Sequence, residues 1–193
     1  RARDLGRNDA YVQNGATTRK DSIVGAFFML NARPAFNVLG KDEGWAEEFQ
    51  REVEEKFTLW AESPMKWVDA SRRNDFTALI RLAVGVDTFG GEVLATAEWL
   101  RDAGREFHTA IQMVDTDRLT TPATRAFDSN IRGGIKTNMY GAPVSAFIRV
   151  QHPHDLSRGF QYSDVWKEVP FYKPWGRQMV LLFSEQNRVD QTR

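Results

Sequence analysis

The chain contains no cysteine and only three histidines among its 193 residues. The missing thiols exclude disulfides and thiolate-held metal sites, which agrees with a reducing compartment. No apolar run approaches the ~20 residues that a membrane-spanning helix needs. Neither sign of charge is in excess, because 26 lysines and arginines balance 26 aspartates and glutamates. The bulk charge therefore provides no general attraction to DNA, RNA or an anionic membrane.

Several catalytic signatures are also missing. The sequence has no G-x-x-x-x-G-K-[ST] motif, so it does not predict a P-loop ATPase, and it has no G-x-S-x-G motif for a serine nucleophile. With 41% hydrophobic residues, a chain of this length can form one domain, or one domain with an appendage. It opens with Arg1 rather than methionine, carries no signal peptide, and stops soon after an apolar strand. We expect it to be part of a longer protein.

The charges that are present are unevenly distributed. Residues 1–20 hold five basic and two acidic side chains, and residues 42–62 hold eight acidic and two basic ones. One interpretation is two solvated helix faces. The other is a pair of oppositely charged patches that meet a partner or a neighbouring copy.

The segment Asn74–Leu100 is predicted to be a helix, a glycine turn and a strand. Asn74 or Asp75 can cap the helix, whose apolar residues recur at helical spacing, and Gly90-Gly91 can end it. From Val93 to Trp99 the period changes to two, which is typical of a strand. We expect the rest of the chain to pack around this unit.

Two further helices are predicted, over Arg1–Gly25 with Asn8-Asp9 as a possible cap, and over Asp42–Ser63. The second carries an aromatic and apolar stripe, which indicates core packing. The stripe comprises Trp45, Phe49, Val53, Phe57 and Trp60. Between these helices, Ala26–Ala35 is predicted to be a buried strand that Pro34 closes.

The second half of the chain reads as strands and loops. Residues 107–113 should pair with 93–99 as an antiparallel hairpin, and Ile131–Thr137 should pair with Pro143–Val150. Met179–Phe183 is a predicted buried strand, whereas 115–128 and 151–175 are predicted loops. The predicted class is α+β, with about three helices packed on an antiparallel or mixed sheet over residues 1–183, followed by a polar arm over 184–193.

Two groups of side chains have some catalytic character. His152, His154 and Asp155 could hold a metal ion, as in a metal-dependent hydrolase, but a proline-rich loop does not fix the ligands that such a site needs, and a polar surface turn is the simpler explanation. Asp115 and Asp117 could act as paired carboxylates, yet no third acid or base is visibly arranged with them. We therefore assign no catalytic, cofactor-binding or metal-binding residue and no cofactor. Four arginines on or near the predicted core elements could contact phosphates: Arg81, Arg118, Arg132 and Arg149.

Four blocks in a fixed order resemble the N-terminal part of lambda-type tailed-bacteriophage portal proteins. The first block contains Asp4-Leu5, Arg7-Asn8, Tyr11 and Ile23-Val24-Gly25. The second contains Arg33-Pro34, Leu39-Gly40, the run Phe49–Glu54 and Phe57. The third contains Phe89–Glu92, Met113-Val114 and Arg118-Leu119, and the last is Gln191-Thr192-Arg193. The blocks extend over nearly the whole chain, although residues 151–175 match no block.

The resemblance implies a structural role in the virion rather than an enzyme. Portal proteins of this type form a dodecameric ring at one capsid vertex, assembled in the host cytoplasm, through which double-stranded DNA is packaged and ejected. The ring meets the major capsid or scaffold protein, the packaging motor (terminase) and then the tail or its adaptor, and no membrane. The chain would be the peripheral wing, with the stem, clip and crown following it. A head–tail adaptor that shares the wing fold is the alternative within the virion.

Overall fold

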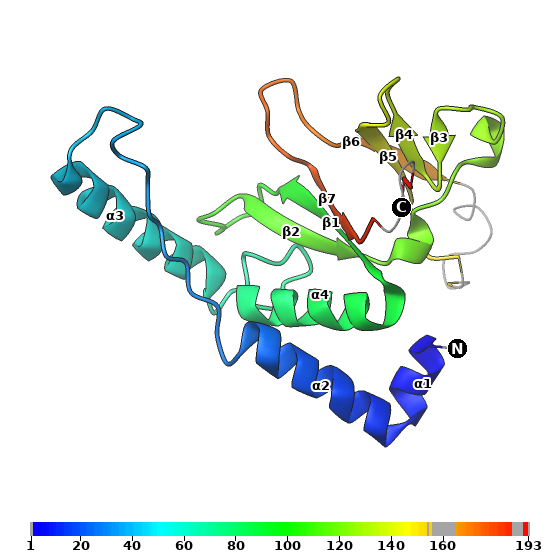
Figure 1. The fold of residues 1–193 in the computed structure, drawn as a ribbon, viewed down its shortest axis with the longest axis horizontal. Coiled ribbons are helices and arrows are strands. Elements are labelled where there is room, and N and C mark those ends of the chain that lie inside the picture. The colour runs from blue at the N-terminus through cyan, green and yellow to red at the C-terminus, as the bar shows by residue number, and fades with distance from the viewer. Residues whose placement is uncertain (1, 154, 156–164, 187–190, 193) are drawn as a thin grey trace.

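The structure is a computed structural model that describes residues 2–153, 155, 165–186 and 191–192. Within these residues, helices and strands build an α+β fold with two antiparallel sheets (Figure 1), which confirms the predicted class. The α-helices are α1 (Ala2–Asn8), α2 (Ala10–Val24), α3 (Glu43–Ala61) and α4 (Phe76–Gly90), with 3-10 helices η1 (Thr116–Arg118) and η2 (Ala123–Arg125). The strands are β1 (Glu92–Trp99), β2 (Thr109–Val114), β3 (Ile131–Arg132), β4 (Ile135–Thr137), β5 (Pro143–Arg149), β6 (Trp166–Pro170) and β7 (Val180–Ser184). Among the described residues, none of the helices combines the length and apolar content needed to cross a bilayer.

The predicted helix–turn–strand unit is confirmed as α4 followed by β1. The Asp75 carboxylate accepts the backbone N–H of Ala78 at 2.8 Å and so caps the first turn of α4. Gly91 ends the helix in the left-handed region at φ 73°, which a residue with a Cβ adopts only at a cost. β1 lies at the centre of the sheet β2-β1-β7 and pairs antiparallel with both neighbours. The predicted hairpin with β2 and the predicted C-terminal strand are therefore both confirmed. The prediction that this last strand is buried is wrong for Leu181 and Phe183, which are 40% and 62% exposed because β7 lies at the edge of the sheet.

Helix α4 covers one face of this first sheet. An apolar hollow of about 260 Å³ between them is lined by Phe76 and Ile80 from α4 and by alternate residues of β1, such as Val93 and Ala95. The other face of β1 carries Leu94, which is fully buried against the second sheet. A strand covered on both faces explains why apolar residues occur on both sides of its alternation.

The second sheet has the order β3-β4-β5-β6 and packs against the far face of the first. Their shared core comprises Leu94, Val114, Leu119, Ile135, Ala146, Ile148, Val169, Phe171 and Val180. The predicted pairing of 131–137 with 143–150 is confirmed for β4 and β5. The first of these strands is, however, broken by a tight turn at Gly133-Gly134, because Gly134 lies at φ 81° against the chain at Thr120.

The prediction that 151–175 is one long loop is wrong over its second part. Residues 166–170 form β6, which pairs antiparallel with β5 and is an edge strand of the second sheet. The segment shows no alternation of apolar and polar residues, because Val169 is its one buried residue. Its strand conformation therefore depends on hydrogen bonding to β5 rather than on its own sequence pattern. Residues 154 and 156–164, and half of the polar arm (187–190 and 193), lie outside the described residues.

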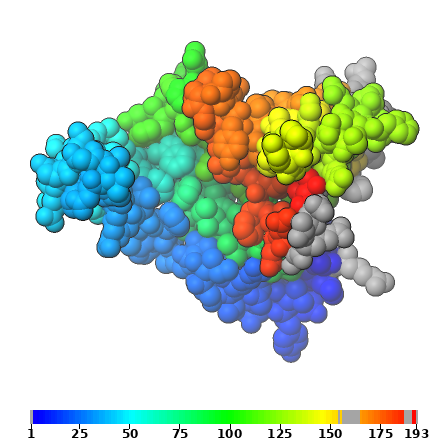
Figure 2. Space-filling view, turned by 45° about the horizontal axis from the view of Figure 1, so that its top comes forward, coloured from blue at the N-terminus to red at the C-terminus, as the bar shows by residue number. Residues whose placement is uncertain are grey.

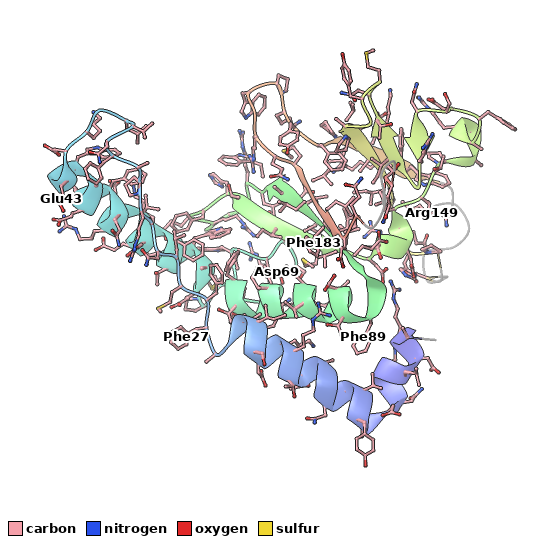
Figure 3. All side chains as sticks on the ribbon, in the orientation of Figure 1. Phe27, Glu43, Asp69, Phe89, Arg149 and Phe183 are labelled. Atoms are coloured by element: carbon pink, nitrogen blue, oxygen red, sulfur yellow. The ribbon has the colours of Figure 1, made fainter. Side chains whose placement is uncertain are left out.

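The N-terminal helical segment is two helices rather than one. Asp9 ends α1 and caps α2, since its carboxylate accepts the backbone N–H groups of Tyr11 and Val12. Gly6 allows α1 to approach the side chain of Phe89 at the end of α4, because a Cβ there would lie 2.8 Å from the ring. Figure 3 shows Phe89 beside α1. Helix α2 packs along α4, where Arg19 pairs with Asp87 at 2.8 Å.

The predicted buried strand over Ala26–Ala35 is wrong. The segment has no strand partner within the described residues, and Phe27 and Met29 are 61% and 73% exposed. Its backbone is held by side chains instead: Thr77 accepts the Phe28 N–H at 3.0 Å, and Glu54 accepts the Ala32 N–H at 2.9 Å. An apolar run alone cannot distinguish a strand from an extended segment that lies across two helices.

Helix α3 projects from the body and is anchored at its C-terminal end (Figure 1). There the rings of Phe57 and Trp60 pack with Phe28 and Phe76 at centroid separations of 5.2–6.3 Å. Trp60 also donates its indole N–H to the backbone carbonyl of Thr109 at 2.8 Å. The predicted aromatic stripe therefore packs into the core only at the C-terminal end of α3, because Phe49, nearer the N-terminal end, is 39% exposed.

Asp69 organises the connection between α3 and α4, near the centre of the molecule (Figure 3). It is only 2% exposed, and its carboxylate accepts five hydrogen bonds, from Ser71 (N and Oγ), Arg73 (N) and Asn74 (N and Nδ2), at 2.8–3.2 Å. Burial by itself would raise the pKa of Asp69, but the bonds from Ser71 and Asn74 hold that pKa below its ordinary value. A single buried carboxylate therefore fixes the turn that leads into α4.

Candidate functional site

One residue of the predicted metal group, His152, lies beside the predicted pair of carboxylates. Asp115 precedes η1, Asp117 lies within it, and His152 follows β5; the three side chains offer ligand atoms that lie within 4.8 Å of one another. Sequence reasoning kept the carboxylates apart from the histidine because 35 residues separate Asp117 from His152. His154 lies outside the described residues, and Asp155 does not belong to this group.

A cation from the chain itself already sits at these carboxylates. The guanidinium of Arg3 reaches Asp117 at 2.7 Å and Asp115 at 3.4 Å, and His152 Nε2 lies 3.6 Å from Asp115. An arginine in this position offsets one of the two negative charges and competes with any metal ion for the same oxygens. Because Arg3 belongs to α1, its ion pairs with Asp115 and Asp117 hold α1 against the end of the first sheet, and we call these ion pairs the clasp. The geometry favours a structural clasp over a hydrolytic metal centre.

The four arginines proposed for phosphate contacts do not form one surface. Arg81 pairs with Asp21 at 2.5 Å, and Arg118 donates to the backbone carbonyls of Arg149 and Val150 at 2.8 and 3.1 Å. Burial lowers the pKa of Arg118, and nearby Asp115 opposes that shift. Arg149, labelled in Figure 3, lies with its guanidinium 5.0 Å from the ring of Trp166. Of the four, Arg132 alone is exposed.

An open cleft of about 750 Å³ lies between the two sheets, beside the connection from β6 to β7. Its walls carry the half-exposed Trp99 and the more exposed Trp175, and the guanidinium of Arg177 lies 5.2 Å from the Trp99 ring. Lysines and glutamates from β1 and β6 complete the lining. Exposed tryptophan and arginine are enriched in protein–protein interfaces, so this cleft is better suited to a protein partner than to a small substrate.

Comparison with known proteins identifies the family. The model of the lambda family of phage portal proteins matches residues 1–193. The chain belongs to this family. It is 34% identical over 193 residues to a portal protein of Escherichia phage N15, and 33% identical over 193 residues to portal protein B of Escherichia phage lambda. In both cases the whole chain is matched, but it spans only 36% and 35% of the relatives' lengths.

For this portal-family chain, a charge pattern that sequence reasoning missed becomes the main surface feature. Residues 118–150 and 165–177, which we call the basic lobe, hold eight basic and two acidic side chains. They build the second sheet and its connections. The charge pattern along the sequence does not reveal this lobe, because its cations are spread over about 60 residues and no short stretch has a clear excess. The excess becomes visible only when the net charge is added up for each half of the fold.

Two basic residues of the N-terminal segment, in contrast, form ion pairs within the chain. Arg3 pairs with Asp115 and Asp117, and Arg19 pairs with Asp87. The acidic residues of α3 remain mostly exposed. The sequence indicated opposite charges on residues 1–20 and 42–62. In the folded chain, the two surfaces of opposite charge are instead α3 and the basic lobe.

Proposed function

We propose that the protein containing this chain is a portal that forms a dodecameric ring at one vertex of a tailed-phage capsid. Double-stranded DNA passes through the ring during packaging and ejection. The packaging motor docks on the ring first, and the tail or its adaptor docks later. The observation that carries the proposal is the family match along all 193 residues.

Within that protein, residues 1–183 serve as a wing-like domain, and residues 184–193 lead toward the stem and clip. The work of the domain is shape and docking: it contacts neighbouring copies and the major capsid or scaffold protein, in the virion and, before that, in the host cytoplasm. The absence of a P-loop motif from these residues fits a division of labour in which the motor hydrolyses ATP. The adaptor alternative receives no support from a match to portal proteins, and the hydrolase alternative receives none from a carboxylate pair that Arg3 occupies.

The test is to purify the protein at its full natural length, alone and with its scaffold, and to measure mass by light scattering and shape by electron microscopy. We expect closed rings with a central channel. A protein that stays monomeric at micromolar concentration under both conditions would refute the proposal.

The isolated 193-residue chain should be mostly monomeric in the same assay. Ring contacts spread over several domains reinforce one another through effective concentration, and a single domain loses that gain. A stable large ring from these residues alone would contradict this expectation.

A further inference from the structure

Helix α3 presents an acidic stripe on the face that it does not use for packing. The stripe comprises Glu48, Glu52, Glu55 and Leu59 on α3 and Glu62 at its C-cap, all exposed, at alternating spacings of four and three residues that place them on one side of the helix. Within the stripe, Glu52 pairs with Lys56. The residues that anchor α3, namely Phe57 and Trp60, lie on another face. Leu59 is 59% exposed, so an apolar side chain stands within the row of carboxylates.

The far end of the molecule presents the opposite charge. We call this surface the basic tip; it comprises Arg125 at the end of η2, Phe127 after it and Arg132 on β3, and all three are exposed. Neither Arg125 nor Arg132 makes an ion pair within the described residues, although the Arg125 guanidinium lies 5.9 Å from the Phe147 ring. Phe127 is fully exposed. Unpaired cations beside a large exposed apolar side chain are typical of a docking surface rather than of a solvated loop.

The two surfaces lie at opposite ends of the longest axis of the chain. Figure 1 shows α3 at one end and β3 with the neighbouring η2 region at the other, and Figure 2 shows both ends protruding from the body. One chain cannot bring its own two ends together, but two copies can. A contact between different surfaces of identical copies is heterologous, and such contacts close into a ring when the rotation between neighbours is suitable.

We infer that the acidic stripe of one copy docks on the basic tip of the next copy around the ring. This inference rests on the proposed ring and specifies which surfaces hold it together. Carboxylates of the stripe would face Arg125 and Arg132, and Leu59 would pack against Phe127. A second copy explains both surfaces at once, whereas DNA bound at the tip would leave the acidic stripe without a role. Complementary charge of this kind fixes the partner and the register of a contact.

The test uses charge reversal in the full-length protein. One variant reverses the stripe (Glu48→Lys with Glu55→Lys), one reverses the tip (Arg125→Glu with Arg132→Glu), and a third combines all four changes. We expect each pair alone to reduce the ring fraction at least tenfold in light scattering, because like charges then face each other across the contact. The combined variant should recover at least half of the wild-type ring fraction. Raising the salt concentration should weaken wild-type ring assembly, since ions screen exposed charges.

Two control variants reverse exposed charges outside both surfaces, Arg7→Glu on α1 and Glu106→Lys between β1 and β2. They should assemble as the wild type does, and circular dichroism should show every variant folded. Normal rings from both reversed pairs would overturn the inference while leaving the proposed ring intact. Loss of rings without recovery in the combined variant would also overturn it, as would a tip variant that assembles normally but loses DNA binding. Failure of the wild type to form rings would instead refute the proposed function.

Discussion

Replacement of Asp69 by asparagine tests how one buried carboxylate holds the connection between α3 and α4. Asparagine has nearly the same shape but only one acceptor oxygen. In its best orientation that oxygen keeps the bonds from Arg73 and Asn74, and the amide N–H₂ turns toward the backbone N–H of Ser71. The Ser71 hydroxyl can rotate to accept a bond, but its N–H donor is left facing another donor.

The cost follows from these contacts. A hydrogen bond to a charged group contributes about 1.5–3 kcal/mol, and a buried donor without a partner costs about 1–3 kcal/mol. Both values describe the loss of the same hydrogen bond, from the backbone N–H of Ser71, so they are not added. We therefore expect Asp69→Asn to lower the free energy of unfolding by about 3 kcal/mol. For a domain of this size the midpoint of thermal unfolding should fall by roughly 6–12 °C. Total stability is typically about 5–15 kcal/mol, so the variant should still fold.

The pH dependence distinguishes this explanation from a simple packing defect. The pKa of Asp69 is lowered in the folded chain, so its contribution is present above the unfolded pKa of about 3.9 and is lost as the pH falls through the lower folded pKa. The wild type should therefore lose stability below about pH 4, and Asp69→Asn should lose less. Urea unfolding followed by tryptophan fluorescence at several pH values measures both effects. Asp21→Asn, whose carboxylate is 59% exposed in its ion pair with Arg81, is the control and should change stability by less than about 1 kcal/mol. Equal urea midpoints for wild type and Asp69→Asn, or parallel pH profiles, would refute the reasoning.

Three further substitutions test the fold by urea unfolding. Phe76→Ala, which removes the ring at the centre of the aromatic cluster under α3, should cost about 3 kcal/mol; a cost below about 1 kcal/mol would show that α3 is anchored otherwise. Gly134→Ala should cost clearly more than Gly141→Ala, because both lie at φ 81° but only the first would place a Cβ 2.7 Å from Thr120 N; equal costs would exclude the steric explanation. Arg3→Ala should cost less than about 1 kcal/mol, since its ion pairs are about 40% exposed, and a loss above 2 kcal/mol would show that the clasp on α1 is stronger than its exposure predicts.

Local pattern was sufficient for the elements whose caps, end signals and periodicity are encoded by neighbouring residues. The cap at Asp75, the end of α4 at Gly90-Gly91 and the change to a strand at β1 were all predictable, as was the hairpin of β1 with β2. These features depend on residues within a few positions of one another. Their physical signals, namely capping oxygens, positive φ at glycine and a period of 3.6 or 2, are therefore contained in short windows.

Prediction failed where the deciding contact is distant in sequence. The apolar run after Gly25 looked like a strand, but Thr77 and Glu54 hold it as an extended segment across two helices. β6 looked like a loop because its pairing with β5 supplies the order that its own residues lack. His152 joined Asp115 and Asp117 only through the packing of β5 beside η1.

The sequence by itself determined the family, the α+β class and the helices that carry an apolar stripe, because order along the chain and local spacing are enough to specify them. Only the tertiary structure decided which charges remain available. Folding pairs Arg3 and Arg19 internally, gathers scattered cations into the basic lobe, and sets them at the opposite end from the acidic face of α3. Charge acts through space rather than along the chain, so the surface that a neighbouring copy would meet exists only once the sheets have packed.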